Sequence, residues 1–290
     1  MDYILLVLAI VLAVSKNLIS KIGKNEFEGL DRLMSANMLA AVTAMVLFAC
    51  SGMKLSVMTD PIFILLAFLY GVFILAAQSL YMLALKSGSV SICSLIYSSG
   101  FLIPTFYSAL VLGEPISLTK WIGIFVMLAA IFAVSAKGEK PQQNSSKVYL
   151  VYTVIAMLMS GALGVMQKLL VKNYGDKCFN EYLFVSFFFM LLGILVLKLF
   201  AKIKAEERVK IYTKRFWILG ILFAIGVAVV NKMNLYLSGA LPGVIFFPCS
   251  NGGIIMLSTL CSAVMFKERL TKIGWAGIIT GVAAIVLIAF

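Results

Sequence analysis

Histidine is absent from this 290-residue sequence, and acidic residues number only 12. Histidine is the commonest metal ligand and the usual proton donor or acceptor at neutral pH, so the simplest metal and hydrolytic sites are excluded. None of the acids falls in the middle of an apolar run, and Glu181 comes nearest to the interior of one. A polytopic membrane enzyme needs acid/base or metal-binding groups that converge. We therefore expect no enzyme activity, metal or cofactor, and keep a membrane enzyme only as the weakest alternative.

Paired cysteines and phosphate-binding motifs are also lacking. The five cysteines form no CxxC pair, and four of them lie in or beside apolar runs, which is typical of small core residues. Nothing matches GxxxxGKS or GxxxxGKT, the loop that cradles ATP phosphates. Primary active transport by this chain alone is thereby excluded.

Apolar residues, in contrast, dominate the chain. They make up 62% of it, only 12% is charged, and the mean hydropathy is +1.07. Soluble domains are about 45–50% apolar and about 25% charged, so the bilayer must be the solvent for most of this chain. The net charge of +12 comes mostly from residues at the ends of apolar runs, which indicates membrane orientation rather than nucleic-acid binding.

Ten apolar runs approach the roughly 20 residues that a spanning helix needs, so the predicted fold is an all-α membrane protein. The expected spans are about 2–20, 33–52, 61–84, 89–112, 117–136, 148–170, 179–200, 215–237, 241–265 and 271–290. A polar linker at 139–147 separates a first five-helix repeat (1–138) from a second one (148–290).

One stretch of the sequence occurs twice, at a constant offset of 154 residues. The offset superposes Glu114 on Glu268, Trp121 on Trp275 and Gly123 on Gly277. Each copy reads as an apolar helix, a tight polar turn with one acid, and a second apolar helix. Because each half has an odd number of helices, the two copies cross the membrane in opposite directions, and the repeat is of the inverted type. That geometry predicts two conformations, one open to each side, as alternating access requires.

This pattern resembles the EamA-like ten-helix members of the drug/metabolite transporter superfamily, and the resemblance covers the whole chain. It rests on the two acid turns, LGEPI at 112–116 and FKERL at 266–270, each followed by a helix with Gly123 or Gly277. The resemblance implies a secondary transporter with a central cavity lined by the first four helices of each half, and with the fifth helices at the periphery. Such proteins move amino acids, nucleotide derivatives, sugars, quaternary amines or drugs. The small four-helix relatives expel cations through a deep carboxylate, which this sequence lacks.

Polar residues inside the apolar spans are the candidates for substrate contact, because an unpaired polar group in lipid is costly. Tyr97 and Asn251 coincide under the repeat offset, and Asn231 lies three residues before Asn234, on one helical face. Interhelical hydrogen bonding is the alternative role for each such residue. The predicted substrate-binding residues are Asn37, Gln78, Tyr81, Tyr97, Ser98, Asn231, Asn234, Ser250 and Asn251.

Three lysines also lie within the spans. We expect the Lys168 side chain to reach the membrane surface, whereas Lys16 and Lys232 lie deeper and would favour an anionic substrate if either faced the cavity. Glu114 and Glu268 are expected to brace their turns by accepting hydrogen bonds from N–H groups at the start of the next helix.

Orientation, location and partners complete the sequence-based expectations. Seventeen of the 24 basic residues fall at the turns after the odd-numbered spans, so the positive-inside rule places both termini outside, whereas the resembling family is usually drawn with both termini inside. We expect a multi-pass plasma-membrane protein that moves a small polar or amphipathic metabolite. A lipid-translocation or accessory protein is the alternative. The small residues Gly277 and Gly281 form GxxxG, a possible homodimer contact.

Overall fold

The computed structural model describes residues 1–23, 25–27, 30–53, 55–87, 89–135, 148–200, 213–267 and 270–289. Within these ranges the chain is all helical, and ten helices are long and apolar enough to cross a membrane. The predicted fold class is therefore confirmed. The elements are α1 (Asp2–Ile22), α2 (Leu30–Cys50), η1 (Leu55–Thr59), α3 (Pro61–Ser87), α4 (Val90–Ser98), η2 (Ser99–Phe101), α5 (Leu102–Leu110), α6 (Leu118–Ser135), α7 (Val148–Tyr174), α8 (Phe179–Phe200), α10 (Lys214–Ala240), α11 (Gly243–Met265) and α12 (Lys272–Ala289).

The predicted span at 89–112 is a broken helix, α4–η2–α5, rather than one continuous α-helix. Pro104 explains the break, because its ring carries no N–H to donate to the Gly100 carbonyl and crowds that carbonyl. The backbone tightens into the short 3₁₀ segment at Ser99–Phe101 instead. A break of this kind in a spanning helix is tolerated where other helices or a cavity cover the freed backbone groups.

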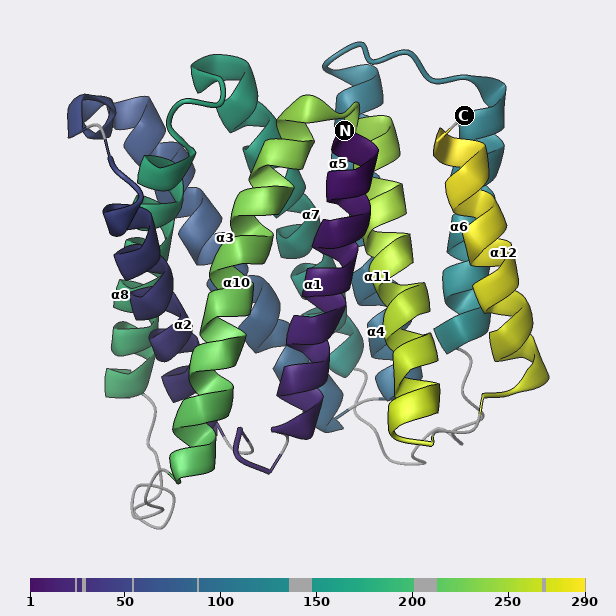
Figure 1. The fold of residues 1–290 in the computed structure, drawn as a ribbon, viewed down its shortest axis with the longest axis horizontal. Helices are drawn as coiled ribbons and strands as arrows, with labels where there is room; N and C mark the ends of the chain where they lie inside the picture. Colours follow the sequence, from purple (N-terminus) through teal and green to yellow (C-terminus); the bar gives the residue numbers. More distant parts are fainter. Residues whose placement is uncertain are drawn as a thin grey trace.

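The helices run between two opposite edges of the molecule, some in front of others in this view, and both chain ends lie at the same edge (Figure 1). We call this edge the terminal side; it also carries the ends of α2, α5, α7 and α10. The opposite edge carries the ends of α1, α3, α8 and α11. It is called the basic side because most lysines and arginines of the sequence follow the odd-numbered spans. Large apolar side chains cover the outer surface, including Ile4 (75% exposed) and Phe125 (62% exposed). Such a surface is suited to lipid.

The two sequence halves interleave rather than forming separate bodies. One core cluster joins α2 and α3 to α7, α8 and α10, and a second joins α1 and α6 to α11 and α12. The pairing of α3 with α7 and of α1 with α10 is consistent with an inverted repeat. The substrate path can therefore lie between the halves.

The helices α6 and α12 pack against each other at the right of the molecule in Figure 1. Gly277 and Gly281 are both buried there: a Cβ atom at Gly277 would lie 2.9 Å from the Ala130 carbonyl oxygen, and one at Gly281 would lie 2.7 Å from Met256. The GxxxG face of α12 is thus already used within one chain, and the homodimer stays a prediction.

Candidate functional site

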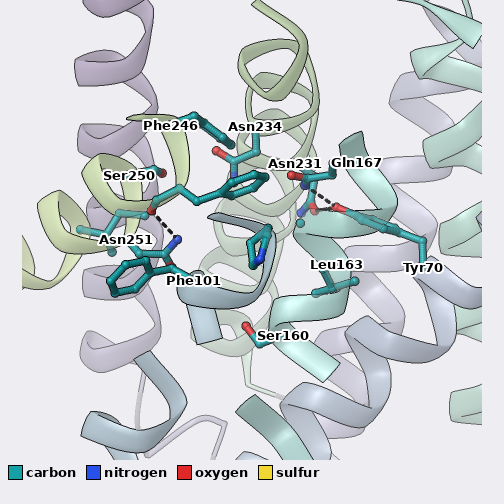
Figure 2. Close-up of a pocket in the computed structure, with 14 residues that line it drawn as sticks. Tyr70, Phe101, Ser160, Leu163, Gln167, Asn231, Asn234, Phe246, Ser250 and Asn251 are labelled. Atoms are coloured by element: carbon teal, nitrogen blue, oxygen red, sulfur yellow. Dashed lines mark hydrogen bonds between the residues drawn. The ribbon is translucent and has the colours of Figure 1, made fainter. Parts of the chain in front are cut away.

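A cavity of about 160 Å³ lies among helices of both halves. The first half contributes residues of α3, η2 and α5, and the second half contributes residues of α7, α10 and α11. Figure 2 shows Ser250 and Asn251 on one side of the cavity and Tyr70, Gln167 and Asn231 on the other. The lining residues are Tyr70, Phe101, Pro104, Ser160, Leu163, Gly164, Gln167, Asn231, Asn234, Phe246, Phe247, Ser250, Asn251 and Ile254. Half of them are polar, and none carries a charge.

A hydrogen-bonded chain of three side chains forms one wall. Tyr70 of α3 donates its hydroxyl to Oδ1 of Asn231 at 3.1 Å, and Nε2 of Gln167 donates to the Tyr70 hydroxyl oxygen at 3.0 Å. Asn231 in turn donates its Nδ2 to the Val227 carbonyl at 2.8 Å. Because Tyr70 is 1% exposed, these contacts join α3, α7 and α10 into a fixed polar wall.

Other polar groups of the lining keep capacity for a solute. Asn251 donates its Nδ2 to the Phe247 carbonyl at 3.0 Å, which leaves its Oδ1 as an acceptor. Among the described residues, none hydrogen-bonds the side chains of Asn234 or Ser250. The cavity therefore offers at least one free amide, one free hydroxyl and one free carbonyl oxygen, next to the rings of Phe101, Phe246 and Phe247.

Glycine and proline bring the helices together at this point. A Cβ atom at Gly164 of α7 would lie 2.7 Å from the Pro104 ring and 2.8 Å from Phe247, so only glycine lets α7 approach both α5 and α11 this closely. Pro248, inside α11, has no N–H for the Val244 carbonyl one turn earlier. The helices with an internal proline, α5 and α11, thus meet Gly164 of α7 beside the cavity.

Four of the nine predicted residues lie on the cavity wall, namely Asn231, Asn234, Ser250 and Asn251. Asn37 instead lines a separate space of about 20 Å³ between α2 and α3, and Oε1 of Gln78 is buried without a partner among the described residues. Ser98 ends α4 and does not line the cavity.

The predicted tyrosines of the first half lie behind the wall. Tyr81 and Tyr97 stack with ring centroids 4.3 Å apart, and the Tyr81 hydroxyl shares a 2.9 Å hydrogen bond with Ser94. Tyr97 itself does not line the cavity, whereas Ser160 does. The repeat-matched residues Tyr97 and Asn251 therefore differ, because Asn251 lines the cavity directly.

The sequence-based set lacks Tyr70, Phe101, Phe246 and Phe247. Aromatic residues within apolar runs look like ordinary core residues, so no pattern distinguished them. Gln167 had a usable signal, since it is an amide inside a spanning helix.

The expectation for Lys168 is wrong. Its side chain does not extend to the membrane surface; the residue is 7% exposed and Nζ lies 2.7 Å from Oε1 of Glu114. Glu114 does brace its turn, but it accepts from the Val244 N–H of α11 rather than from the start of α6, the next helix. Glu268 lies outside the described residues. An anionic substrate was expected only if Lys16 or Lys232 faced the cavity. Neither lysine lines it.

Residues 1–136 match the model of the EamA-like transporter family. An uncharacterized protein of Haemophilus influenzae is 25% identical over 293 residues, which cover 97% of this chain and 95% of that protein. A solved crystal structure superposes with a TM-score of 0.76 at 14% identity, covering all of this chain and 98% of the other. The family match covers the first acid turn and confirms the resemblance there, and the structural match supports the same fold over the whole chain.

Proposed function

We propose that this EamA-like chain is a secondary transporter that moves a small, uncharged, amphipathic metabolite by alternating access. The observation that carries the proposal is the cavity between the two halves, with free hydrogen-bonding groups beside three phenylalanine rings and no charged residue in its wall. As a multi-pass integral membrane protein with ten spanning helices, the chain acts as a transporter rather than an enzyme. We place it in the plasma membrane.

The chemistry of the wall supports a net-uncharged substrate. An ion moved from water into a site without a counter-charge loses hydration that dipoles alone replace poorly. Amides and hydroxyls pair well with the amides and hydroxyls of a solute, and the rings of Phe101 and Phe246 cover an apolar part of it. At about 160 Å³ the cavity holds roughly five waters of ~30 Å³ each, which suits an amino-acid-sized molecule.

The position of the cavity supports alternating access. It is built from both halves, next to the broken helix α4–η2–α5 and the proline of α11. In inverted-repeat transporters the site lies at the repeat interface, near discontinuous helices, and one half rocks against the other around it.

A thermal-shift series with one side chain and four charge states tests the substrate class. The probes are N-acetyl-leucinamide (neutral), leucine (zwitterionic), leucinamide (cationic) and N-acetyl-leucine (anionic). Because a ligand stabilises the state that it binds, we expect the neutral probe to raise the melting temperature most. In Asn234→Asp, where a carboxylate replaces the free amide, the preference should move to the cationic probe. Stabilisation by the anion alone, or by lipid probes alone, would contradict the proposed class.

A further inference from the structure

Glu114 links three elements from both halves on the terminal side. Its Oε1 accepts from Nζ of Lys168 on α7 at 2.7 Å, and its Oε2 accepts from the backbone N–H of Val244 at the start of α11 at 3.2 Å. Its own backbone N–H donates to the Ser108 carbonyl of α5 at 3.0 Å. One side chain in the turn after α5 therefore holds two helices of the other half.

Lys168 completes the cluster. Its Nζ also donates to the Leu241 carbonyl at 3.1 Å, just before α11 begins. The pair is largely shielded from solvent, with side-chain exposures of 8% for Lys168 and 18% for Glu114. Charge-assisted hydrogen bonds in such a place are stronger than neutral ones, and a lone charge left there would be strongly disfavoured.

Gly243 lets the helices come close enough for these bonds. A Cβ atom there would meet the side chains of Ser108 and Lys168. Because α11 begins at Gly243, its first turn packs against Ser108 of α5 and the Lys168 side chain of α7. The cluster thus depends on a glycine as well as on two opposite charges.

The cluster lies next to the cavity wall. Lys168 follows Gln167 in α7, and Val244 comes two residues before Phe246 in α11; Gln167 and Phe246 both line the cavity. The start of α11 belongs to the terminal side (Figure 1). Glu114 and Lys168 therefore hold α11 in place between the cavity and the terminal side.

The corresponding lysine of the first helix is Lys16. Lys16 lies six residues before the end of α1, as Lys168 lies six residues before the end of α7, but it belongs to the basic side. Among the described residues none forms an ion pair or hydrogen bond with Lys16. The Glu114–Lys168 ion pair of the terminal side thus has no counterpart at Lys16 among the described residues, which leave out Glu268.

We infer that Glu114 and Lys168 are positioning residues that keep the cavity closed on the terminal side, and that their bond breaks each time the cavity opens there. The term "Glu114–Lys168 latch" is used for the contacts among Glu114, Lys168, Leu241 and Val244. The inference rests on the proposed transport function, because a static membrane protein needs no such release. The latch touches the helices that carry the site but not the cavity, so its loss should change turnover more than ligand affinity.

Spin-label distances across the terminal side test the latch without a substrate. Labels on Ser117→Cys, in the turn after Glu114, and Ala240→Cys, at the end of α10, occupy exposed positions on the terminal side, one in each half. The native cysteines are replaced, and the protein is held in nanodiscs. We expect one short distance in the parent protein and roughly tenfold more of a longer distance in Glu114→Gln. Lys168→Met, which removes the other partner, should give the same shift.

The double variant Glu114→Gln/Lys168→Met is the control for a merely structural role. If the two residues act as one latch, the double variant opens no further than either single variant. Gly243→Ala, which keeps both charges but crowds the contact, should open the terminal side as well. Unchanged distances in folded single variants, or additive effects in the double variant, would overturn the latch. Failure of every ligand to bind would instead count against the proposed function and leave the distance result intact.

Discussion

Gly113 and Lys267 adopt the same left-handed backbone conformation, with φ angles of 69° and 54°, at positions 154 residues apart. Each follows the helix that leads into an acid turn, α5 in the first half and α11 in the second. Glycine adopts this conformation freely, whereas a lysine Cβ crowds the following carbonyl. The two turns therefore repeat in backbone shape although the residue at the critical position differs.

The first prediction exchanges the residue types at these turns. Lys267→Gly relieves the left-handed strain and should raise the free energy of unfolding by about 1 kcal/mol, while Gly113→Ala should lower it by a similar amount. No atom lies within 4 Å of a Cβ built on Gly113, so the effect there comes from the backbone alone. Thermal unfolding in detergent measures both. Gly274→Ala, in a helix where a Cβ meets nothing closer than 3.4 Å, is the matched control. A destabilising Lys267→Gly would show that the lysine side chain has a compensating role.

The second prediction concerns Asn251 and Tyr97. Asn251→Ala removes an acceptor from the cavity wall and should weaken substrate binding by roughly 0.5–1.5 kcal/mol, a few-fold in affinity. Tyr97→Phe removes a hydroxyl that lies behind the cavity wall rather than on it, so we expect a smaller loss of transport. Uptake assays and fluorescence-detected size exclusion separate transport from the amount of folded protein. Unaltered transport in Asn251→Ala would remove this residue from the site.

The third prediction concerns thiol reactivity. Burial, reinforced by the negative charge of Glu181, raises the pKa of the Cys178 thiol from 9.0 to about 11. Only the thiolate reacts, so alkylation of Cys178 should be very slow at neutral pH and rise about tenfold per pH unit toward pH 11. The raised pKa also makes stability depend on pH. The contribution of the neutral Cys178 thiol to the free energy of unfolding is complete below pH 9 and is lost as pH rises through about 11. Mass spectrometry of labelled peptides gives the rates, with exposed Cys50 as the comparison. Equal labelling of both at neutral pH in folded protein would contradict the expectation.

The fourth prediction concerns orientation. The charge bias places the basic side in the cytoplasm, so an impermeant thiol reagent added to intact cells should label Ser117→Cys and spare Lys272→Cys. Both positions are exposed at helix ends on opposite sides, which makes each the control for the other. The reverse pattern would support the orientation in which the resembling family is usually drawn. Permeabilised cells should label both variants.

The boundaries of the spans were readable from the sequence because lipid imposes a length and a composition on each helix. The expected span at 61–84, for example, is α3, and the expected span at 179–200 is α8 without any change. The sequence analysis predicts a continuous span here and misses the break at Ser99–Phe101, although the sequence contains Pro104. A proline inside a helix predicts a distortion, but neighbouring contacts decide its form, as the uninterrupted α11 around Pro248 shows.

The sequence by itself thus determined a ten-helix membrane protein in two similar halves, because hydropathy and the repeated turns depend only on local residues. It also supplied Asn231, Asn234, Ser250 and Asn251, since amides and hydroxyls in lipid need partners. Only the tertiary structure decided which polar residues share one cavity and which lie behind it, as Tyr97 does. It alone showed that Lys168 pairs with Glu114, because that bond joins residues 54 positions apart in different halves. Such pairings follow from how helices pack across the halves, which periodicity along one helix does not encode.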